Sequence, residues 1–109
     1  MSLRAVFKER EKEKKSLRKA AITEVRGLAV LLRKRFQFES LYICGSILTD
    51  NFRSHSDIDI VVRGLRVEDF FKAHAFLMKE SRYEIDLKPF EDLTEDFREK
   101  VLTRGVKIK

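Results

Sequence analysis

Three aspartates and a Gly-Ser pair are the residues of this 109-residue chain whose types and spacing could do chemistry. Asp57 and Asp59 stand two residues apart in an apolar, β-branched stretch, and Asp86 stands in a second stretch of alternating polarity. Because residues i and i+2 of a strand point to the same face, Asp57 and Asp59 should project together. If the apolar residues of both strands face one core, Asp86 joins them on the opposite face.

Such a cluster of carboxylates is costly unless a cation neutralises it. At about 4 Å and an effective dielectric constant near 20, each like-charge pair costs about 4 kcal/mol. A divalent cation with a preference for oxygen removes this repulsion, and Mg²⁺ typically combines carboxylates with substrate phosphates. Two ions held in this way can activate an attacking oxygen and stabilise a leaving one. The aspartates therefore predict a two-metal site.

Gly45-Ser46 ends the strand that precedes these aspartates in the sequence. Glycine lets the backbone approach a phosphate closely, and a serine hydroxyl with free N–H groups at a helix start can hold an anion. Ser56 is a further candidate phosphate ligand, although a turn is the simpler interpretation of its position. A phosphate cradle beside metal-binding carboxylates is the arrangement that triphosphate chemistry needs.

Composition limits the classes of protein that can carry this site. The length indicates one domain, residues 1–109, divided into a basic N-terminal helix (1–36) and a core (39–109). One cysteine and two histidines exclude an intrachain disulfide and a thiolate or imidazole zinc site. No apolar run is long enough for a membrane span and the N-terminus is too charged for a signal peptide, so we expect a cytoplasmic protein.

The positive charge is concentrated in the N-terminal segment. The whole chain carries +6, but residues 1–36 carry +8 and residues 37–109 carry −2. This pattern indicates a solvated helix face, or a surface for an acidic protein or a nucleic acid.

Hydrophobic periodicity predicts helices alternating with strands. Helices are expected over 5–36, 67–79 and 92–103, strands over 41–44, 57–62 and 83–88, and a short edge strand over 106–109. Thr94 is an alternative N-cap for the last helix, and Gly105 is its expected C-cap. This order predicts an α/β (α+β) fold with a small mixed sheet, helices on one face and the carboxylates on the open face.

The same residues carry a resemblance to a known family. Gly45-Ser46, ten intervening residues and Asp57-Ile58-Asp59 resemble the G-S-x10-D-x-D signature of the DNA polymerase beta-type nucleotidyltransferases. The stretch YICGSILTDNFRSHSDIDIVV is similar to the minimal nucleotidyltransferase branch. The stretch EIDLKPFEDLTEDFREKVLTRGVKI is similar to the closing strand, helix and terminal strand of that branch, with Asp86 at the third-carboxylate position.

The resemblance implies a polymerase beta-like palm and a reaction. A nucleoside monophosphate, AMP if the substrate is ATP, passes from an NTP to a hydroxyl with the help of two Mg²⁺ ions, for which Mn²⁺ can substitute. Asp57 and Asp59 would bind both ions, and Asp86 would hold the catalytic ion and help activate the acceptor. Gly45 and Ser46 would grip the β- and γ-phosphates. Many minimal members are antitoxins paired with a HEPN-domain ribonuclease, and some attach AMP to its tyrosine. Independently of the resemblance, the apolar stripe from Leu17 to Phe36 is longer than a core of this size can cover, which predicts a homo- or hetero-oligomer formed through residues 3–36.

The sequence departs from the family pattern at two positions. Thr49 and Asp50 stand where members commonly carry arginine and glycine, which removes a phosphate contact and adds negative charge; Arg53 or Lys88 could compensate. The alternative function is therefore an inactive antitoxin-like module that neutralises a partner by binding it. Nucleic-acid binding through the basic helix ranks third, because aromatic and basic residues do not interleave there.

Overall fold

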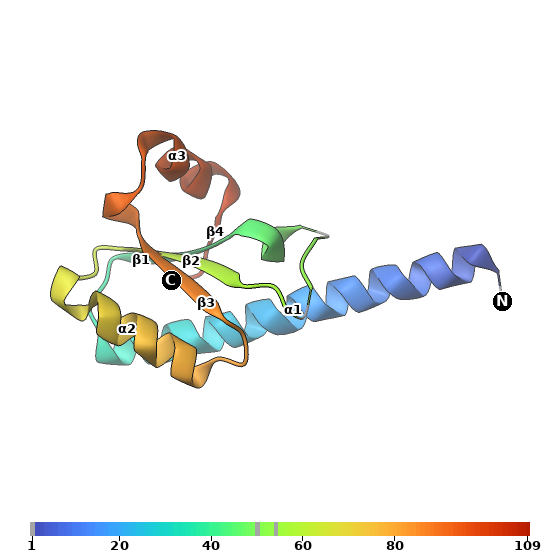
Figure 1. The fold of residues 1–109 in the computed structure, drawn as a ribbon, viewed down its shortest axis with the longest axis horizontal. Coiled ribbons are helices and arrows are strands. Elements are labelled where there is room, and N and C mark those ends of the chain that lie inside the picture. The colour runs from blue at the N-terminus through green and yellow to red at the C-terminus, as the bar shows by residue number, and fades with distance from the viewer. Residues whose placement is uncertain (1, 50, 54) are drawn as a thin grey trace.

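A computed structural model describes residues 2–49, 51–53 and 55–109 of the chain. The N-terminal helix α1 (Leu3–Arg35) leads into strand β1 (Ser40–Cys44) and a 3₁₀ turn, η1 (Gly45–Leu48). Strand β2 (Ile58–Arg63), helix α2 (Val67–Glu80) and strand β3 (Ile85–Pro89) follow. A second 3₁₀ turn, η2 (Phe90–Asp92), helix α3 (Glu95–Arg104) and the short strand β4 (Val106–Lys107) complete the order, which confirms the predicted alternation (Figure 1).

The four strands form one mixed sheet in the order β3-β2-β1-β4. Strands β1 and β2 are antiparallel, β1 and β4 are antiparallel, and β2 and β3 are parallel. The parallel pair is joined through α2, since parallel neighbours need a long crossover connection. The mixed α/β fold predicted from the sequence is confirmed.

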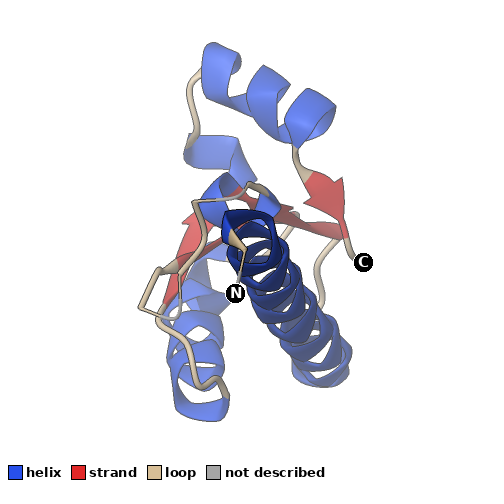
Figure 2. Ribbon diagram, turned by 90° about the vertical axis from the view of Figure 1, so that its right-hand side faces the viewer, coloured by secondary structure: helices blue, strands red, loops and turns tan. Residues whose placement is uncertain are grey.

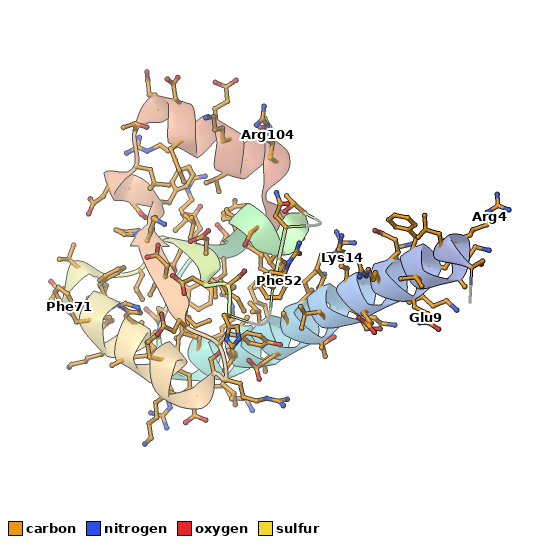
Figure 3. All side chains as sticks on the ribbon, turned by 45° about the vertical axis from the view of Figure 1, so that its right-hand side comes forward. Arg4, Glu9, Lys14, Phe52, Phe71 and Arg104 are labelled. Carbon is orange, nitrogen blue, oxygen red and sulfur yellow. The ribbon has the colours of Figure 1, made fainter. Side chains whose placement is uncertain are left out.

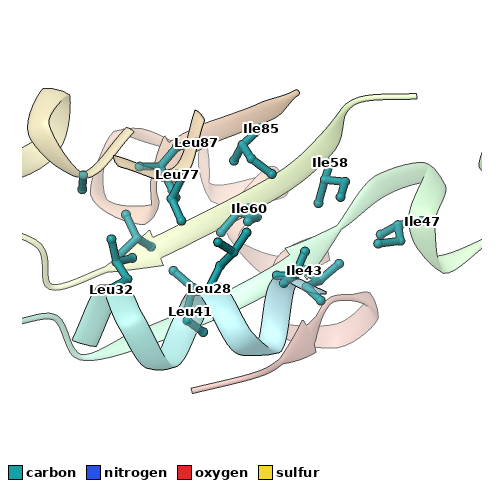
Figure 4. Packing of buried hydrophobic residues seen from close by; sticks show 14 of the residues in the cluster. Leu28, Leu32, Leu41, Ile43, Ile47, Ile58, Ile60, Leu77, Ile85 and Leu87 are labelled. Carbon is teal, nitrogen blue, oxygen red and sulfur yellow. The ribbon is translucent and has the colours of Figure 1, made fainter. Parts of the chain in front are cut away.

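The main core lies between one face of this sheet and helices α1 and α2 (Figure 4). The alternating apolar residues of β2 and β3 point into it, as their period of two predicts. The second half of α1 supplies its apolar stripe, whereas the first half extends beyond the sheet and sets the long axis of the 56 × 30 × 19 Å molecule (Figure 1). The buried residues of α1 are Ala21, Val25, Leu28, Ala29 and Leu32.

The third helix lies on the opposite face of the sheet from α1 and α2 (Figure 2). Its Val101 packs with Tyr42 of β1, Val61 of β2 and Phe90 of η2 in a second, smaller core. The order of the elements predicted all helices on one face and the other face open; that face is instead covered over β1 and part of β2. The reason is that Tyr42 and Val61 make this face apolar there, and α3 buries them.

Local signals explain where the short elements begin and end. Thr94, the alternative N-cap, is the one used: its hydroxyl accepts a hydrogen bond from the Phe97 N–H at 3.2 Å, and Gly105 is the C-cap.

Within the described residues, no helix is both long and apolar enough to cross a membrane.

Candidate functional site

Two of the three predicted aspartates lie side by side on the face of the sheet that carries α3. Asp59 of β2 and Asp86 of β3 are register partners across the parallel pair, so their side chains leave neighbouring backbones in the same direction. Asp57 lies just before β2, which begins at Ile58, and its side chain is exposed. The sequence placed Asp57 inside the strand; the structure places it one residue before the strand begins.

A lysine side chain lies against the two paired carboxylates. The Nζ atom of Lys88 is 2.7 Å from Oδ2 of Asp86 and 3.6 Å from Oδ1 of Asp59. Lys88 follows Asp86 by two positions on β3, and this spacing puts both side chains on one face. An ammonium group therefore occupies the position of a bound cation between the carboxylates.

The electrostatics of the site reflect this crowding. Burial raises the pKa of Asp59; the charge of Lys88 opposes the rise, while Asp86 and Asp57 add to it. Burial acts to lower the pKa of Lys88, but its hydrogen bond to Asp86 and the charges of both carboxylates outweigh burial and raise that pKa. The three aspartates are thus close enough to repel one another, and Lys88 relieves part of that repulsion.

Gly45 has a structural reason for being glycine. Its φ of +81° lies in the region that side chains disfavour, and a Cβ atom there would stand 2.2 Å from Oδ2 of Asp59. The backbone of η1 therefore approaches the carboxylate itself. The next residue, Ser46, accepts two hydrogen bonds at its carbonyl oxygen from the N–H and hydroxyl of Thr49, which close the turn.

Ser56 is used in a turn before β2. Its hydroxyl accepts a hydrogen bond from the Arg53 N–H at 2.9 Å, and its own N–H donates to the Arg53 carbonyl at 3.0 Å. The turn interpretation of Ser56 is therefore confirmed, and its role as a phosphate ligand stays a prediction.

Only one of the two residues suggested as substitutes for the missing arginine, Lys88, lies at the carboxylates. Arg53 lines a hollow against α1, and Lys88 is paired with the carboxylates. Asp50 lies outside the described residues.

A cleft of about 450 Å³ opens between η1 and α3, next to Gly45. This volume falls in the range of roughly 300–1,000 Å³ that is typical of small-molecule sites. Its floor and sides are mostly apolar, and its two charged side chains both belong to α3. The lining residues are Cys44, Gly45, Leu48, Thr49, Phe97, Lys100, Val101, Arg104 and Gly105.

Cys44 forms part of the cleft and is not activated. Burial and the nearby charge of Asp59 raise the pKa of its thiol to about 11, against a smaller lowering by Lys88. A thiol with so high a pKa stays protonated at neutral pH, so Cys44 contributes shape to the cleft and no nucleophile.

Sequence reasoning missed the contribution of α3 to the site. Phe97, Lys100 and Arg104 recur at three- and four-residue steps and so share one helix face, which is a visible signal. What the sequence could not supply was the side of the sheet on which this helix packs. That packing turns an ordinary amphipathic helix into one wall of the cleft.

The donors suit a hard divalent cation in their chemistry. Asp59 and Asp86 offer carboxylate oxygens from adjacent strands, which are the ligands that Mg²⁺ prefers. No three His, Cys, Asp or Glu side chains among residues 2–49, 51–53 and 55–109 are drawn together tightly enough to hold a metal ion. The ammonium of Lys88 instead lies between the two carboxylates.

Comparison with known proteins identifies the family. The family model described as polymerase beta, nucleotidyltransferase matches residues 27–109. A toxin–antitoxin crystallised with AMP-PNP is 19% identical, with a TM-score of 0.66 over 77% of this chain and 72% of that one. A mutant of the toxin–antitoxin MntA-HpeT is 18% identical, with a TM-score of 0.64 over 77% and 71%. No curated protein sequence matches significantly. The match over most of its length shows that the chain belongs to the polymerase beta nucleotidyltransferase family.

Proposed function

We propose that this protein transfers a nucleoside monophosphate from an NTP, ATP in the first instance, to a hydroxyl group with the help of Mg²⁺ or Mn²⁺. One observation carries the proposal: Asp59 and Asp86 stand as register partners beside Gly45, at the edge of a cleft large enough for a small molecule. Family membership makes nucleotidyl transfer the chemistry to which this geometry is best suited.

Each residue of the site has a role in this proposal. Asp57 and Asp59 would hold both metal ions and Asp86 the catalytic one, while Gly45 and Ser46 would face the β- and γ-phosphates. Bound divalent ions supply charge neutralisation and Lewis acidity at the phosphates. The acceptor oxygen forms a bond to the α-phosphorus, and the bond from that phosphorus to the bridging oxygen breaks. Pyrophosphate leaves with the electron pair, and Asp86 takes the hydroxyl proton.

The acceptor we propose is a tyrosine or other hydroxyl of a partner protein of the HEPN class. The two structural neighbours named above are toxin–antitoxins, and one of them contains AMP-PNP. The N-terminal half of α1 offers a place for such a partner, because it extends beyond the core and its Leu3 and Phe7 are 76% and 59% exposed. Contiguous exposed apolar groups rimmed by charge mark interaction sites.

A second candidate function is neutralisation of a partner by binding alone. It is favoured by Lys88, which fills the space between Asp59 and Asp86, and by Thr49 at the place of the family arginine. In this alternative the carboxylates bind no metal, and the surface of α1 neutralises the partner by binding it.

The experiment that separates the two uses radiolabelled ATP and the partner protein. We expect the wild type to label the partner in Mg²⁺ and the Asp57→Asn, Asp59→Asn double variant to lose labelling while keeping its fold, since Asn retains the shape and removes the charge. Glu68→Gln on α2, an exposed carboxylate on the other side of the sheet, is the matched control. Labelling by the double variant at the wild-type rate would overturn the enzyme proposal. A wild type that silences the partner without labelling it would establish the binding function.

A further inference from the structure

We infer that Lys100 and Arg104 of α3 bind the triphosphate of the incoming nucleotide from across the cleft, and that they supply the positive charge that position 49 lacks. The inference rests on the proposed function and extends it to two residues outside the family signature. Both are among the residues of α3 that line the cleft, Thr49 lines it from the end of η1, and Figure 3 labels Arg104 at the end of α3.

The first support is the placement of the two cations. They are four residues apart on α3, so they lie one above the other on the same helix face. That face is fixed over the cleft because Val101 is buried in the second core against Tyr42 and Val61. A helix anchored on its core side fixes the backbone positions from which both side chains extend.

The second support concerns the partners of the two cations. Among the residues that the structure describes, Lys100 and Arg104 make no ion pair and no side-chain hydrogen bond. Arg98 on the same helix behaves differently: it donates to the carbonyl oxygens of Phe90 and Glu91 and stacks against the Phe90 ring. Arg98 therefore holds η2 in place, whereas the two cations over the cleft are available to a ligand.

The third support is the charge pattern around the cleft. The charged side chains in its lining are both positive, and its η1 wall meets the carboxylate of Asp59 at Gly45. The two cations therefore favour an anionic group on the α3 side of the cleft, and such a group would approach the carboxylates through a bound cation. A metal-bound triphosphate has both properties: its β- and γ-phosphates would contact α3, while its α-phosphate would lie toward Asp59. Arginine and lysine are the usual partners of phosphate oxygens.

The position of Thr49 connects this wall to the family pattern. Members commonly carry arginine at that place, and Thr49 here lines the same cleft as Lys100 and Arg104. Cations on α3 therefore line the same cleft as position 49. The departure at position 49 then moves the phosphate contact from one wall to the other.

The test measures binding of Mg²⁺–AMP-PNP, inorganic triphosphate and adenosine by calorimetry. We expect Lys100→Met and Arg104→Met to weaken the two triphosphate ligands about tenfold each, the loss typical of one charge-assisted hydrogen bond, and to leave adenosine unchanged. Methionine keeps helix propensity, so α3 should persist. Lys107→Met on β4 is the control, because it removes the same charge from an exposed residue outside the cleft.

The outcomes separate this inference from the proposed function. The inference is overturned if the double variant Lys100→Met, Arg104→Met has the melting temperature of the wild type and also its affinity for Mg²⁺–AMP-PNP. That result would not contradict the proposal of nucleotidyl transfer. Equal weakening by Lys107→Met also overturns the inference, since the effect would then be one of net charge. A wild type that binds no triphosphate ligand overturns both. If Arg104→Lys binds the triphosphate ligands more tightly than Arg104→Met does, the result supports a direct contact between this side chain and a phosphate.

Discussion

Replacing Lys88 by methionine removes the ammonium that lies between Asp59 and Asp86 and keeps the length of the side chain. The ammonium is 2.7 Å from Asp86 and 3.6 Å from Asp59, and the side chains of Lys88, Asp59 and Asp86 are 36%, 35% and 48% exposed. Because a third or more of each is in water, the bulk dielectric constant is the appropriate limit. It gives about 1.5 and about 1.2 kcal/mol for the two pairs. Immobilising a lysine side chain costs up to about 2 kcal/mol, so the net contribution to folding is about 1 kcal/mol.

We therefore expect Lys88→Met to lower the melting temperature of the metal-free protein by about 4 °C. The effect on metal binding should have the opposite sign, because a divalent ion no longer has to displace the ammonium. About 1 kcal/mol corresponds to roughly fivefold tighter binding of Mg²⁺. Added Mg²⁺ should thus restore the melting temperature of the variant more strongly than that of the wild type.

The assay is a set of melting curves over a Mg²⁺ series, with calorimetric titration of Mn²⁺ as a second measurement. Lys72→Met is the control, since Lys72 is exposed on α2 away from the carboxylates. The reasoning is refuted if Lys88→Met and Lys72→Met respond alike to Mg²⁺. It is also refuted if loss of Lys88 weakens metal binding, which would mean that the lysine orients the carboxylates for the ion.

Three other predictions test the remaining parts of the site. Without metal and at neutral pH, Asp59→Asn should melt at a higher temperature than the wild type. The pKa of Asp59 is raised above 3.8 in the folded protein, so the wild type gains stability as the pH falls through that pKa. The difference in melting temperature between the two proteins should therefore shrink at acidic pH. Alkylation of Cys44 by iodoacetamide should be slow at pH 8, since its pKa is about 11, and slower still with Mg²⁺–ATP in the cleft. Changing Leu3 and Phe7 to serine should leave the melting curve unaltered and weaken the complex with the partner in sedimentation; a lower melting temperature would place both residues in the core.

Most of the fold could be predicted from the sequence because apolar and polar residues alternate along its strands. The apolar residues Ile58 and Ile60 and their counterparts Ile85 and Leu87 point to α1 and α2, so Asp59 and Asp86 had to share the other face. Alternation says nothing about which strands are neighbours or in which direction they run. The register that sets Asp59 opposite Asp86 is therefore a property of the packed sheet.

The cleft was less predictable because it depends on a helix whose side of the sheet was ambiguous. The apolar residues of α3 are few, and they fit either face of the sheet by pattern alone. The missed signal was in the strands: Tyr42 and Val61 are apolar residues on the carboxylate face, and they need cover. Reading that pair as a second core would have placed α3 over η1 and Lys100 over the cleft.

The position of α1 relative to η1 bears on how a single small domain could act on a protein acceptor. The loop after η1 returns against α1, where Phe52 and Arg53 line a hollow with Lys14 and Leu17. The free half of the helix therefore starts below the loop that follows Gly45-Ser46 and extends away from the body (Figure 1). The partner proposed above, held along that half, would therefore lie next to the loop that follows Gly45-Ser46, on the side of the domain from which α1 extends.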